Sequence, residues 1–266
     1  MQTLYIDGGC LDAAIKDLRN AIGGVELEFD YLSLVNKFNA ERAFYYDALP
    51  GSRDNLNEAK FQEVRQKKEA FFQSIAKQNK LHVRTGVTRW ERMGSANKEK
   101  QKQKAVDVLL AVDVVSDALK GNIDRAIVLT SDLDFYPVFE ALLQSRVHTT
   151  LIYRPGHVAS ELIEVADGAI PLRFSTLLDC CEPNFAAKYR PIVLNESGSL
   201  LQQEREKAQT VVFRGHEIAV WQQEDKHFVC FYANSRVVSL SKVLAIEYWT
   251  QGRTEALTFS DGSIYP

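Results

Sequence analysis

The chain has 266 residues, of which 45% are hydrophobic, and a formal net charge of −3. This length allows one large domain, or one domain with a smaller second one, and the charge excludes a protein that is basic over its whole surface. The four cysteines form no CxxC pair, and the sequence shows neither a signal-peptide pattern nor an apolar run long enough to span a bilayer. We therefore expect a reduced, cytoplasmic protein without a membrane anchor.

Short apolar strands alternate with amphipathic helices over the first two thirds of the chain. This alternation indicates parallel strands with helices on both faces, and ligands of such sheets bind at the carboxyl ends of the strands. The sequence therefore predicts an α/β fold. We expect strands at 3–6, 42–46, 81–87, 126–130, 149–153 and 169–170, and helices at 10–22, 31–38, 55–78, 104–119, 135–144 and after residue 156.

The pattern changes near residue 180. Residues 181–208 are polar and mixed in composition, which predicts a linker between a first domain (1–180) and a last one (209–266). In the last domain, alternating runs separated by turn signals predict a small antiparallel β-domain that resembles a barrel. Its expected strands lie at 211–213, 218–221, 228–232, 243–249 and 256–259.

Four aspartates lie near the edge where the carboxyl ends of the predicted strands should meet. Asp7 ends the first strand, Asp132 and Asp134 follow the strand at 126–130, and Asp107 opens an apolar helix. Carboxylates that are brought together repel each other unless a cation neutralises them, and Mg²⁺ and Mn²⁺ prefer carboxylate oxygens. The pattern predicts a shared metal site.

The same acids also have a purely structural interpretation. Asp132 would cap the helix that begins near residue 135, while Asp134 and Asp107 would complement the dipoles of first helical turns. The position of Asp7 at the equivalent end of another strand favours the shared site over this alternative.

A basic segment, residues 80–104, leads into Asp107. It holds eight lysines and arginines against two glutamates. Basic side chains neutralise phosphates and tryptophan stacks on unpaired bases, so we expect this segment to hold nucleic acid, with a mobile loop at 94–97; a solvated charged loop is the alternative. The candidate binding residues are Arg89, Trp90, Lys98, Lys100, Lys102 and Lys104.

Three motifs follow one another in a recognisable order: Leu4-Tyr5-Ile6-Asp7-Gly8-Gly9, Lys104-Ala105-Val106-Asp107-Val108-Leu109-Leu110-Ala111-Val112-Asp113, and Thr130-Ser131-Asp132-Leu133-Asp134-Phe135. Together with Ala166-Asp167-Gly168-Ala169-Ile170, they resemble the NYN family, including its LabA-like branch, in the PIN-like nuclease superfamily, over about residues 1–175. The resemblance implies a Rossmann-like PIN fold and RNA cleavage that depends on Mg²⁺ or Mn²⁺. It also implies the metal and catalytic carboxylates Asp7, Asp107, Asp132 and Asp134, with Asp113 as a further metal candidate.

Cys10 departs from the family pattern, which has asparagine at this position. A thiol is a weak hydrogen-bond donor and cannot replace an amide. The alternative function is therefore an NYN-fold protein that binds RNA or scaffolds a complex without cutting it. For cleavage, Thr130 and Ser131 would position carboxylate or phosphate oxygens, the lysines would bind flanking phosphates, and single-stranded DNA is an alternative substrate.

The C-terminal β-domain allows three interpretations. Its aromatic residues Trp221, Phe231, Tyr232 and Trp249, with the basic residues Lys226, Arg236, Lys242 and Arg253, would recruit single-stranded RNA. Alternatively, the aromatic residues fill the domain's own core. The third interpretation is self-association of the chain as a homo-oligomer through this domain.

Overall fold

The computed structural model describes residues 1–50, 58–93, 98–104, 106–194, 198–223, 227–250 and 256–265, and at 58–59, 87–93 and 98–104 it describes the backbone alone. The chain forms two compact units. Unit 1 comprises Met1–Asp12, Tyr31–Tyr153 and Val158–Ile170, and unit 2 comprises Ala13–Asp30, Arg154–His157 and Pro171–Pro266. None of the described helices is both long enough and apolar enough to cross a membrane.

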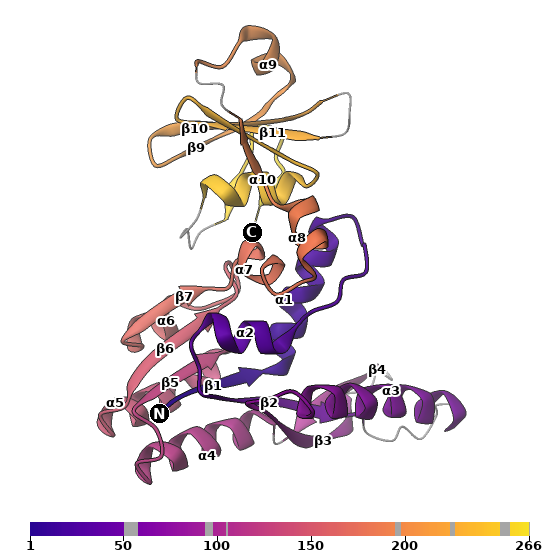
Figure 1. Cartoon of the computed structure of the whole chain (residues 1–266), viewed down its shortest axis with the longest axis vertical. Helices are drawn as coiled ribbons and strands as arrows, with labels where there is room; N and C mark the ends of the chain where they lie inside the picture. The colour runs from indigo at the N-terminus through magenta and orange to yellow at the C-terminus, as the bar shows by residue number, and fades with distance from the viewer. Residues whose placement is uncertain are drawn as a thin grey trace. The chain divides into compact units, whose positions relative to one another are not determined.

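Unit 1 is built on a seven-stranded sheet (Figure 1) with the strand order β4-β3-β2-β1-β5-β6-β7. From β3 through β6 each neighbouring pair is parallel, whereas β4 runs antiparallel to β3. The predicted parallel α/β fold is confirmed. The strands are β1 (Gln2–Asp7), β2 (Arg42–Leu49), β3 (Leu81–Met93), β4 (Lys98–Lys104), β5 (Arg125–Leu129), β6 (His148–Tyr153) and β7 (Gly168–Pro171).

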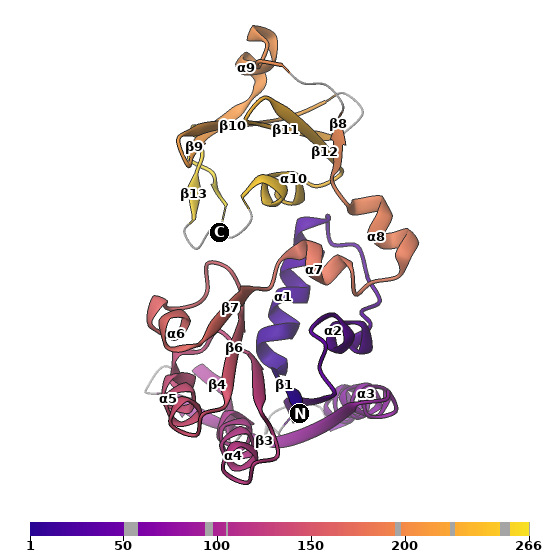
Figure 2. The same cartoon turned by 60° about the vertical axis from the view of Figure 1, so that its left-hand side comes forward.

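Helices cover both faces of this sheet. On one face α3 packs on β2 and β3, and on the other face α4 packs on β1, β2 and β3, with α5 beside it (Figure 2). The helices of this part of the chain are α1 (Gly8–Ala21), α2 (Tyr31–Lys37), α3 (Glu58–Ala76), α4 (Val106–Leu119), the short 3₁₀ helix η2 (Leu133–Phe135), α5 (Tyr136–Gln144) and α6 (Ser160–Val165).

Strand β2 shows how the two faces are filled. The Tyr45 ring lies against the rings of Tyr31 in α2 and Phe71 in α3, with centroid distances of 5.6 and 6.0 Å. The next residue, Tyr46, belongs to the core cluster on the α4 side, together with Tyr5. Both side chains are fully buried. Because successive strand residues point to opposite faces, this tyrosine pair anchors both helical layers to one strand.

The basic segment contains more strand structure than predicted. Strand β3 continues past the expected end at Val87 as far as Met93, and β4 pairs with it in an antiparallel arrangement that we call the β3–β4 ribbon. Helix α4 begins at Val106 instead of residue 104, because Lys104 is the last residue of β4. The expected loop at 94–97 lies outside the described residues.

Asp167, in the last segment of the family resemblance, has a structural role. Its carboxylate accepts hydrogen bonds from the backbone N–H of Thr149 (2.7 Å) and from the Thr149 hydroxyl (2.9 Å), at the start of β6. The backbone hydrogen bond is the main reason why the pKa of Asp167 lies below its usual range. These two hydrogen bonds hold the residue that precedes β7 beside the start of β6.

Unit 2 contains a five-stranded antiparallel sheet in the order β8-β12-β11-β10-β9. The predicted antiparallel β-domain is confirmed, but strands β8 and β9 form its two edges, so the described residues form an open sheet instead of a barrel. The elements of this part are α7 (Phe174–Leu178), α8 (Pro183–Tyr189), β8 (Ile192–Leu194), α9 (Gln202–Lys207), β9 (Gln209–Phe213), β10 (His216–Gln222), β11 (Phe228–Tyr232), β12 (Ser235–Ser239), α10 (Lys242–Trp249), β13 (Leu257–Thr258) and β14 (Ile264–Tyr265).

Two expectations for this region are wrong. Residues 243–249 form helix α10, because the Ser241 side chain caps the helix and accepts a hydrogen bond from the Leu244 N–H at 3.3 Å. A continuous apolar run does not distinguish a strand from a buried helix. The expected linker at 181–208 contains α8, β8 and α9, and β8 pairs with β12 through Val193 and Val237.

Most of the predicted RNA-recruiting side chains of unit 2 serve its own packing. Trp221 and Phe231 are each 7% exposed, on the sheet face that Leu200 covers. Tyr232 and Trp249 pack, half-buried, in the cluster on the α10 face. Arg236 is buried and forms an ion pair with Glu204, whereas Lys226 and Arg253 lie outside the described residues. The interpretation as core therefore holds for the aromatic residues.

Gly86 lets the start of α4 approach β3. A Cβ atom at this position would lie 2.4 Å from Val106 Cγ2 and 3.3 Å from the Val106 backbone nitrogen, and Val106 is buried. We expect Gly86→Ala to lower the free energy of unfolding by about 1–3 kcal/mol, the usual cost of overpacking. Urea denaturation of the full chain measures this change.

Gly168→Ala is the matched control for that substitution. A Cβ at Gly168 would meet no atom closer than Thr150 Oγ1 at 3.8 Å, so its stability should stay unchanged or rise slightly. Equal stabilities of the two variants would contradict the proposed steric role of Gly86.

Candidate active site

Asp7 is the last residue of β1, and α1 begins at the next residue. Its carboxylate accepts hydrogen bonds from the Cys10 N–H (3.2 Å) and from the Thr130 hydroxyl (3.1 Å). Gly8 permits the direct change from strand to helix, because a Cβ there would lie 2.7 Å from the Tyr46 carbonyl oxygen. The Asp7 side chain is thus held between the first turn of α1 and the end of β5.

Thr130 connects Asp7 to the other acids that follow β5. Thr130 is fully buried, and its Oγ1 also accepts a hydrogen bond from the Asp132 N–H at 3.2 Å. The Asp132 carboxylate in turn accepts the Asp134 N–H at 3.0 Å and caps η2. The capping role of Asp132 is therefore on η2 and not, as predicted, on the helix that begins near residue 135, since the N-cap of α5 is Phe135. It is compatible with a shared site, because a carboxylate has two oxygens and this bond uses one of them.

Asp107 lies in the first turn of α4, on the acidic side of the site. Burial, together with the negative charges of Asp132 and Asp134, raises its pKa above the usual range. Repulsion of this kind requires nearby charges. The charges of the segment after β5 therefore act on the acid carried by α4.

Burial also raises the pKa of Asp7, from its ordinary 3.8 to about 6. The Asp107 charge adds to this increase, whereas the hydrogen bonds from Cys10 and Thr130 oppose it. Asp7, Asp107, Asp132 and Asp134 are thus connected by repulsion or through hydrogen bonds, and we call them the acidic cluster.

The structure places Asp113 away from the acidic cluster. Its carboxylate accepts hydrogen bonds from Arg84 Nε (2.8 Å) and Nη2 (3.1 Å), and from the Tyr46 hydroxyl (3.1 Å). Six residues along a helix correspond to a rotation of about 240°, so Asp113 leaves the side of α4 on which Asp107 lies. Its contacts are those of a structural ion pair and not of a fifth metal ligand.

The acidic cluster suits a divalent cation by its donor chemistry. Its oxygens are hard ligands of the kind that Mg²⁺ and Mn²⁺ prefer, and burial, with a smaller contribution from repulsion among the acids, raises the pKa values of Asp7 and Asp107. Among the described residues, no three acidic, histidine or cysteine side chains already converge as they would around a metal ion. The carboxylates would therefore have to move closer together to bind one.

Ser131 and Cys10 lie beside the acidic cluster. Cys10 Sγ is 3.6 Å from Ser131 Oγ, so the side chain at the family's asparagine position contacts the segment that carries Asp132. Cys10 also supplies the backbone N–H that holds Asp7. The hydrogen bond from the Cys10 backbone N–H to Asp7 does not depend on which side chain occupies position 10.

The β3–β4 ribbon begins next to Asp107. The last β3 residue that pairs with β2 is Val87, so the ribbon continues past the carboxyl edge of the sheet. Lys104 pairs with Val87 and precedes Asp107 by three residues. Alternate positions along a ribbon share one face, and one face holds the positions of Arg89, Lys98, Lys100, Lys102 and Lys104, whereas Trp90 pairs with Gln101 on the other.

A second polar group at the carboxyl end of β2 was missed by the sequence analysis. Lys68 of α3 lies 2.5 Å from an Asp47 oxygen and 3.4 Å from an Asp12 oxygen, and the Tyr45 hydroxyl donates to Asp12 at 3.1 Å. Burial raises the pKa of Asp12, against the effect of the Lys68 charge. The position of Asp47 just after an apolar strand segment, as with Asp7, was the available signal.

Comparison with known proteins relates residues 3–173 to the NYN domain, whose model matches this range. Among solved structures, a protein of unknown function from Vibrio parahaemolyticus is similar, with 18% identity, a TM-score of 0.46, and coverage of 68% of this chain and 95% of that chain. No protein with a curated description matches. The matched range contains the acidic cluster and the β3–β4 ribbon.

The raised pKa of Asp7 predicts how Asp7→Asn affects stability. The folded state holds a proton on Asp7 up to about pH 6, whereas the unfolded chain releases it near 3.8. Stability is therefore lost as the pH rises through this window, and the loss persists above it. In EDTA at pH 7.5, Asp7→Asn should raise the free energy of unfolding by about 1–3 kcal/mol, and the gain should vanish below about pH 4.

Asp113→Asn is the control for this prediction, measured by urea denaturation over the same pH range. The substitution leaves Arg84 without its charged partner, so it should lower stability at pH 7.5. A destabilised Asp7→Asn variant at pH 7.5 would show that Asp7 is not electrostatically strained.

Proposed function

Because the chain belongs to the NYN domain family, which lies in the PIN-like nuclease superfamily, we propose that it is a metal-dependent endoribonuclease. The proposed reaction is hydrolysis of RNA phosphodiester bonds at the acidic cluster, with Mg²⁺ or Mn²⁺ as cofactor. Placement in the LabA-like branch stays a prediction.

The main support for the proposal is that Asp7 and the segment of Asp132 and Asp134 follow neighbouring parallel strands, β1 and β5, and that the charges of Asp132 and Asp134 act on Asp107. Burial in the first place, and repulsion by the other acids in the second, raise the pKa values of Asp7 and Asp107, so that their charged forms are costly in the folded chain. A fold that only needed helix caps would not require Asp107, whose charge adds to this repulsion. The cost is expected where a cation binds.

The residues of the chain have separate tasks in this proposal. Asp7, Asp107, Asp132 and Asp134 would hold the cation, which when bound supplies positive charge and makes a water molecule more acidic. Thr130 orients Asp7 through its hydroxyl and Asp132 through its Oγ1 acceptor. Ser131 offers a hydroxyl group beside the cluster to a phosphate oxygen.

The β3–β4 ribbon supports RNA as the substrate. Its base adjoins Asp107, and register places the four lysine positions of β4 on one face. A row of positive charge that extends from the acidic cluster would hold the phosphates of a strand on both sides of the cut. Trp90 occupies a position on the other face of the ribbon, where it pairs with Gln101, and base stacking by Trp90 stays a prediction. Single-stranded DNA has the same backbone charge and stays an alternative substrate.

The competing function is binding of RNA, or scaffolding, without cleavage. Cys10 in place of the family's asparagine supports it, as does the separation of the described carboxylates. Cleavage of a mixed pool of RNA and single-stranded DNA, in EDTA and then with Mn²⁺ or Mg²⁺ restored, separates the two functions. Metal-restored cleavage supports the nuclease; salt-dependent binding without cleavage supports the alternative.

Two further aspects of the proposal concern location and assembly. All four cysteines are free thiols, which supports a reduced compartment such as the cytoplasm.

Exposed Ile192 and Val212 lie on the edge strands β8 and β9, which supports self-association through the C-terminal sheet.

Asp132→Asn and Asp107→Asn should each lower metal-dependent cleavage by about a hundredfold or more, because each removes a ligand charge. Asp113→Asn is the matched control and should retain cleavage when assayed below its melting temperature. Circular dichroism checks that all three variants are folded. Cleavage at the wild-type rate in Asp132→Asn would remove this carboxylate from the mechanism.

Replacing Lys98, Lys100 and Lys102 with alanine should weaken RNA binding and reduce the salt slope of log K by about 2–3, because three fewer counterions are released. Replacing Lys60, Lys67 and Lys77 removes the same charge from exposed positions on and just after α3 and serves as control. Filter binding at several salt concentrations measures both slopes. Equal slopes in the two variants would mean that the ribbon is only a solvated surface.

A further inference from the structure

Helix α4 carries apolar side chains on the side that faces away from its own core. Val108, Val112 and Leu119 are 64%, 54% and 72% exposed, and Val115 of the same side is half-buried. These four residues, which we call the α4 stripe, lie within about 60° of one another around the helix axis, and buried Leu110 lies on the opposite side. A surface helix is normally polar on its outer side, whereas a helix that is apolar all round is normally buried. The stripe therefore has the composition of a covered surface.

Nothing in the described part of unit 1 covers this surface. The inner side of α4 packs on β1, β2 and β3, with α5 beside it. In both Figure 1 and Figure 2, α4 forms an outer layer of unit 1, and no other described element of this unit lies over its outer side. The occupant of the stripe must therefore come from elsewhere.

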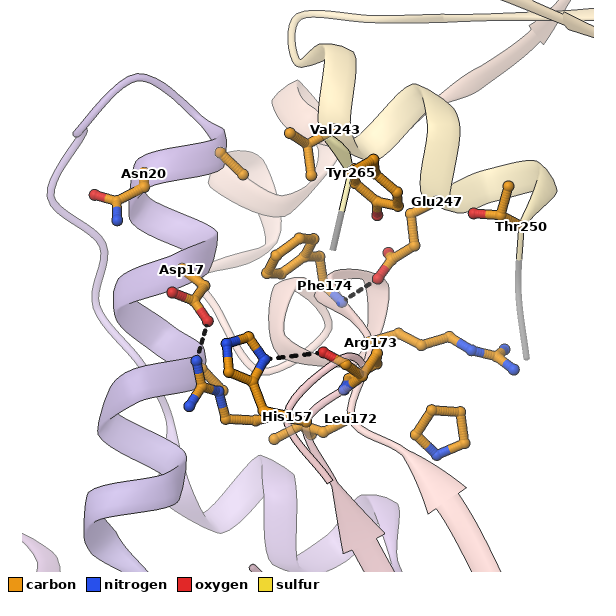
Figure 3. Close-up of a pocket in the computed structure, with 15 residues that line it drawn as sticks. Asp17, Asn20, His157, Leu172, Arg173, Phe174, Val243, Glu247, Thr250 and Tyr265 are labelled. Atoms are coloured by element: carbon orange, nitrogen blue, oxygen red, sulfur yellow. Dashed lines mark hydrogen bonds and ion pairs between the residues drawn. The ribbon is translucent and has the colours of Figure 1, made fainter. Parts of the chain in front are cut away.

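The cavity of about 420 Å³ in unit 2, which Figure 3 shows in close-up, differs from the stripe in this respect. The acidic groups of its lining have partners within the same unit. Asp17 pairs with Arg154 at 2.5 Å, and Glu247 accepts the backbone N–H groups of Phe174 (2.8 Å) and Ser175 (3.1 Å). These contacts belong to the internal packing of unit 2, whereas the α4 stripe is open to solvent.

The spacing of the stripe is that of a helix surface that packs against another helix. Positions 108, 112, 115 and 119 follow one another at intervals of four, three and four residues. Alternating intervals of three and four are typical of coiled coils, in which each apolar side chain inserts between side chains of the facing helix. The spacing therefore indicates an apolar helix as the occupant.

The same intervals are obtained when the stripe is read from either end. In an antiparallel pair of α4 helices, Val108 would face Leu119 of the partner subunit, and Val112 would face Val115 of the partner subunit. Every layer of such a pair joins two apolar side chains. An interface around a twofold axis uses the same surface of both subunits, so it requires a surface that is complementary to itself. This property favours a second copy of the chain over an unrelated helix.

The charges of α4 are also compatible with the pairing of two identical surfaces. The positions that flank the stripe are Ala111 and Ser116, which are small and uncharged. The aspartates that follow Asp107 on α4 are engaged within their own chain: Asp113 pairs with an arginine of β3, and Asp117 accepts the Tyr5 hydroxyl at 2.7 Å. Two identical charged surfaces would repel each other. The uncharged stripe and its uncharged flanks avoid this repulsion.

We propose that the α4 stripe is a dimer interface, at which two copies of this chain pair through antiparallel α4 helices. The stripe contributes four residues from each copy, against about 20–30 a side in a standard interface, so the dimer is weak. The two acidic clusters lie at opposite ends of the helix pair. The proposal does not depend on nuclease activity, and it uses a different surface from the edge strands β8 and β9.

Sedimentation equilibrium of the full chain in EDTA, from about 10 μM to about 1 mM, measures the association. The chain should show a concentration-dependent equilibrium between monomer and dimer. Val112→Lys and Leu119→Lys each place a charge in the apolar contact and should weaken dimerisation at least tenfold. Lysine is a good helix former, and at the end of α4 it complements the helix dipole, so circular dichroism should show folded variants. A chain that stays monomeric up to about 1 mM overturns the proposal.

Val64→Lys is the matched control, because Val64 is an exposed valine on α3, outside the stripe. This variant should dimerise like the unmodified chain. Val212→Lys introduces the same charge on the edge strand β9 and should also leave dimerisation unchanged. Unchanged dimerisation in the folded Val112→Lys and Leu119→Lys variants overturns the proposal, and loss of the dimer in Val212→Lys alone places the interface on the C-terminal sheet and overturns it too.

Disulfide cross-linking tests the antiparallel arrangement. Positions 108 and 119 face each other in the proposed pair, whereas the two copies of position 108 are offset by about 17 Å along the helices, too far for a disulfide. Mild oxidation should therefore cross-link a mixture of Val108→Cys and Leu119→Cys chains, but neither variant alone. The four native cysteines are buried and should not react. The absence of a cross-link in the mixture, or cross-links in each variant alone, overturns the antiparallel pairing.

Discussion

The buried carboxylate of Asp7 is the constraint on which the candidate site depends. It ends one strand, caps the helix that follows, and accepts a hydroxyl group from the end of the neighbouring strand. Burial at this point makes its negative charge costly, as its pKa of about 6 shows. The surrounding fold must therefore be rigid enough to keep the carboxylate in place, and its hydrogen bonds give it one fixed orientation toward the other acids.

Two glycines supply this rigidity by allowing close approach. Gly8 brings the start of α1 against the backbone of β2, and Gly86 brings the start of α4 against β3. Gly8 directly follows Asp7 in the sequence. Gly86 faces Val106, the residue that precedes Asp107. Backbone packing therefore fixes the chain positions of Asp7 and Asp107, whereas the carboxylates themselves would still have to move closer together to bind a cation.

Much of this arrangement could be predicted from the sequence, because apolar periodicity reveals parallel strands and the chain order then places Asp7 and Asp132 at one edge. The rest depended on information that periodicity does not contain. Strands β4 and β12 contain polar residues that hide any apolar strand pattern in the sequence. Both form because they pair with a neighbouring strand, β4 with β3 and β12 with β11. The apolar run of α10 fits a strand equally well until Ser241 is recognised as its cap. Asp113 shares a helix with Asp107, but helix rotation directs it to Arg84.

The buried guanidinium of Arg236 has a consequence for the cooperativity of the C-terminal sheet. It binds Glu204 and the carbonyl oxygens of Gly198 and Ser199, so strand β12 and the segment over the sheet share one charge pair. Separating them would leave an ion in an apolar environment, at a cost of several kcal/mol. The segment and the strand should therefore open together in amide hydrogen exchange. Two polypeptides divided near residue 208 would each carry half of this pair, which gives them a reason to reassemble by fragment complementation.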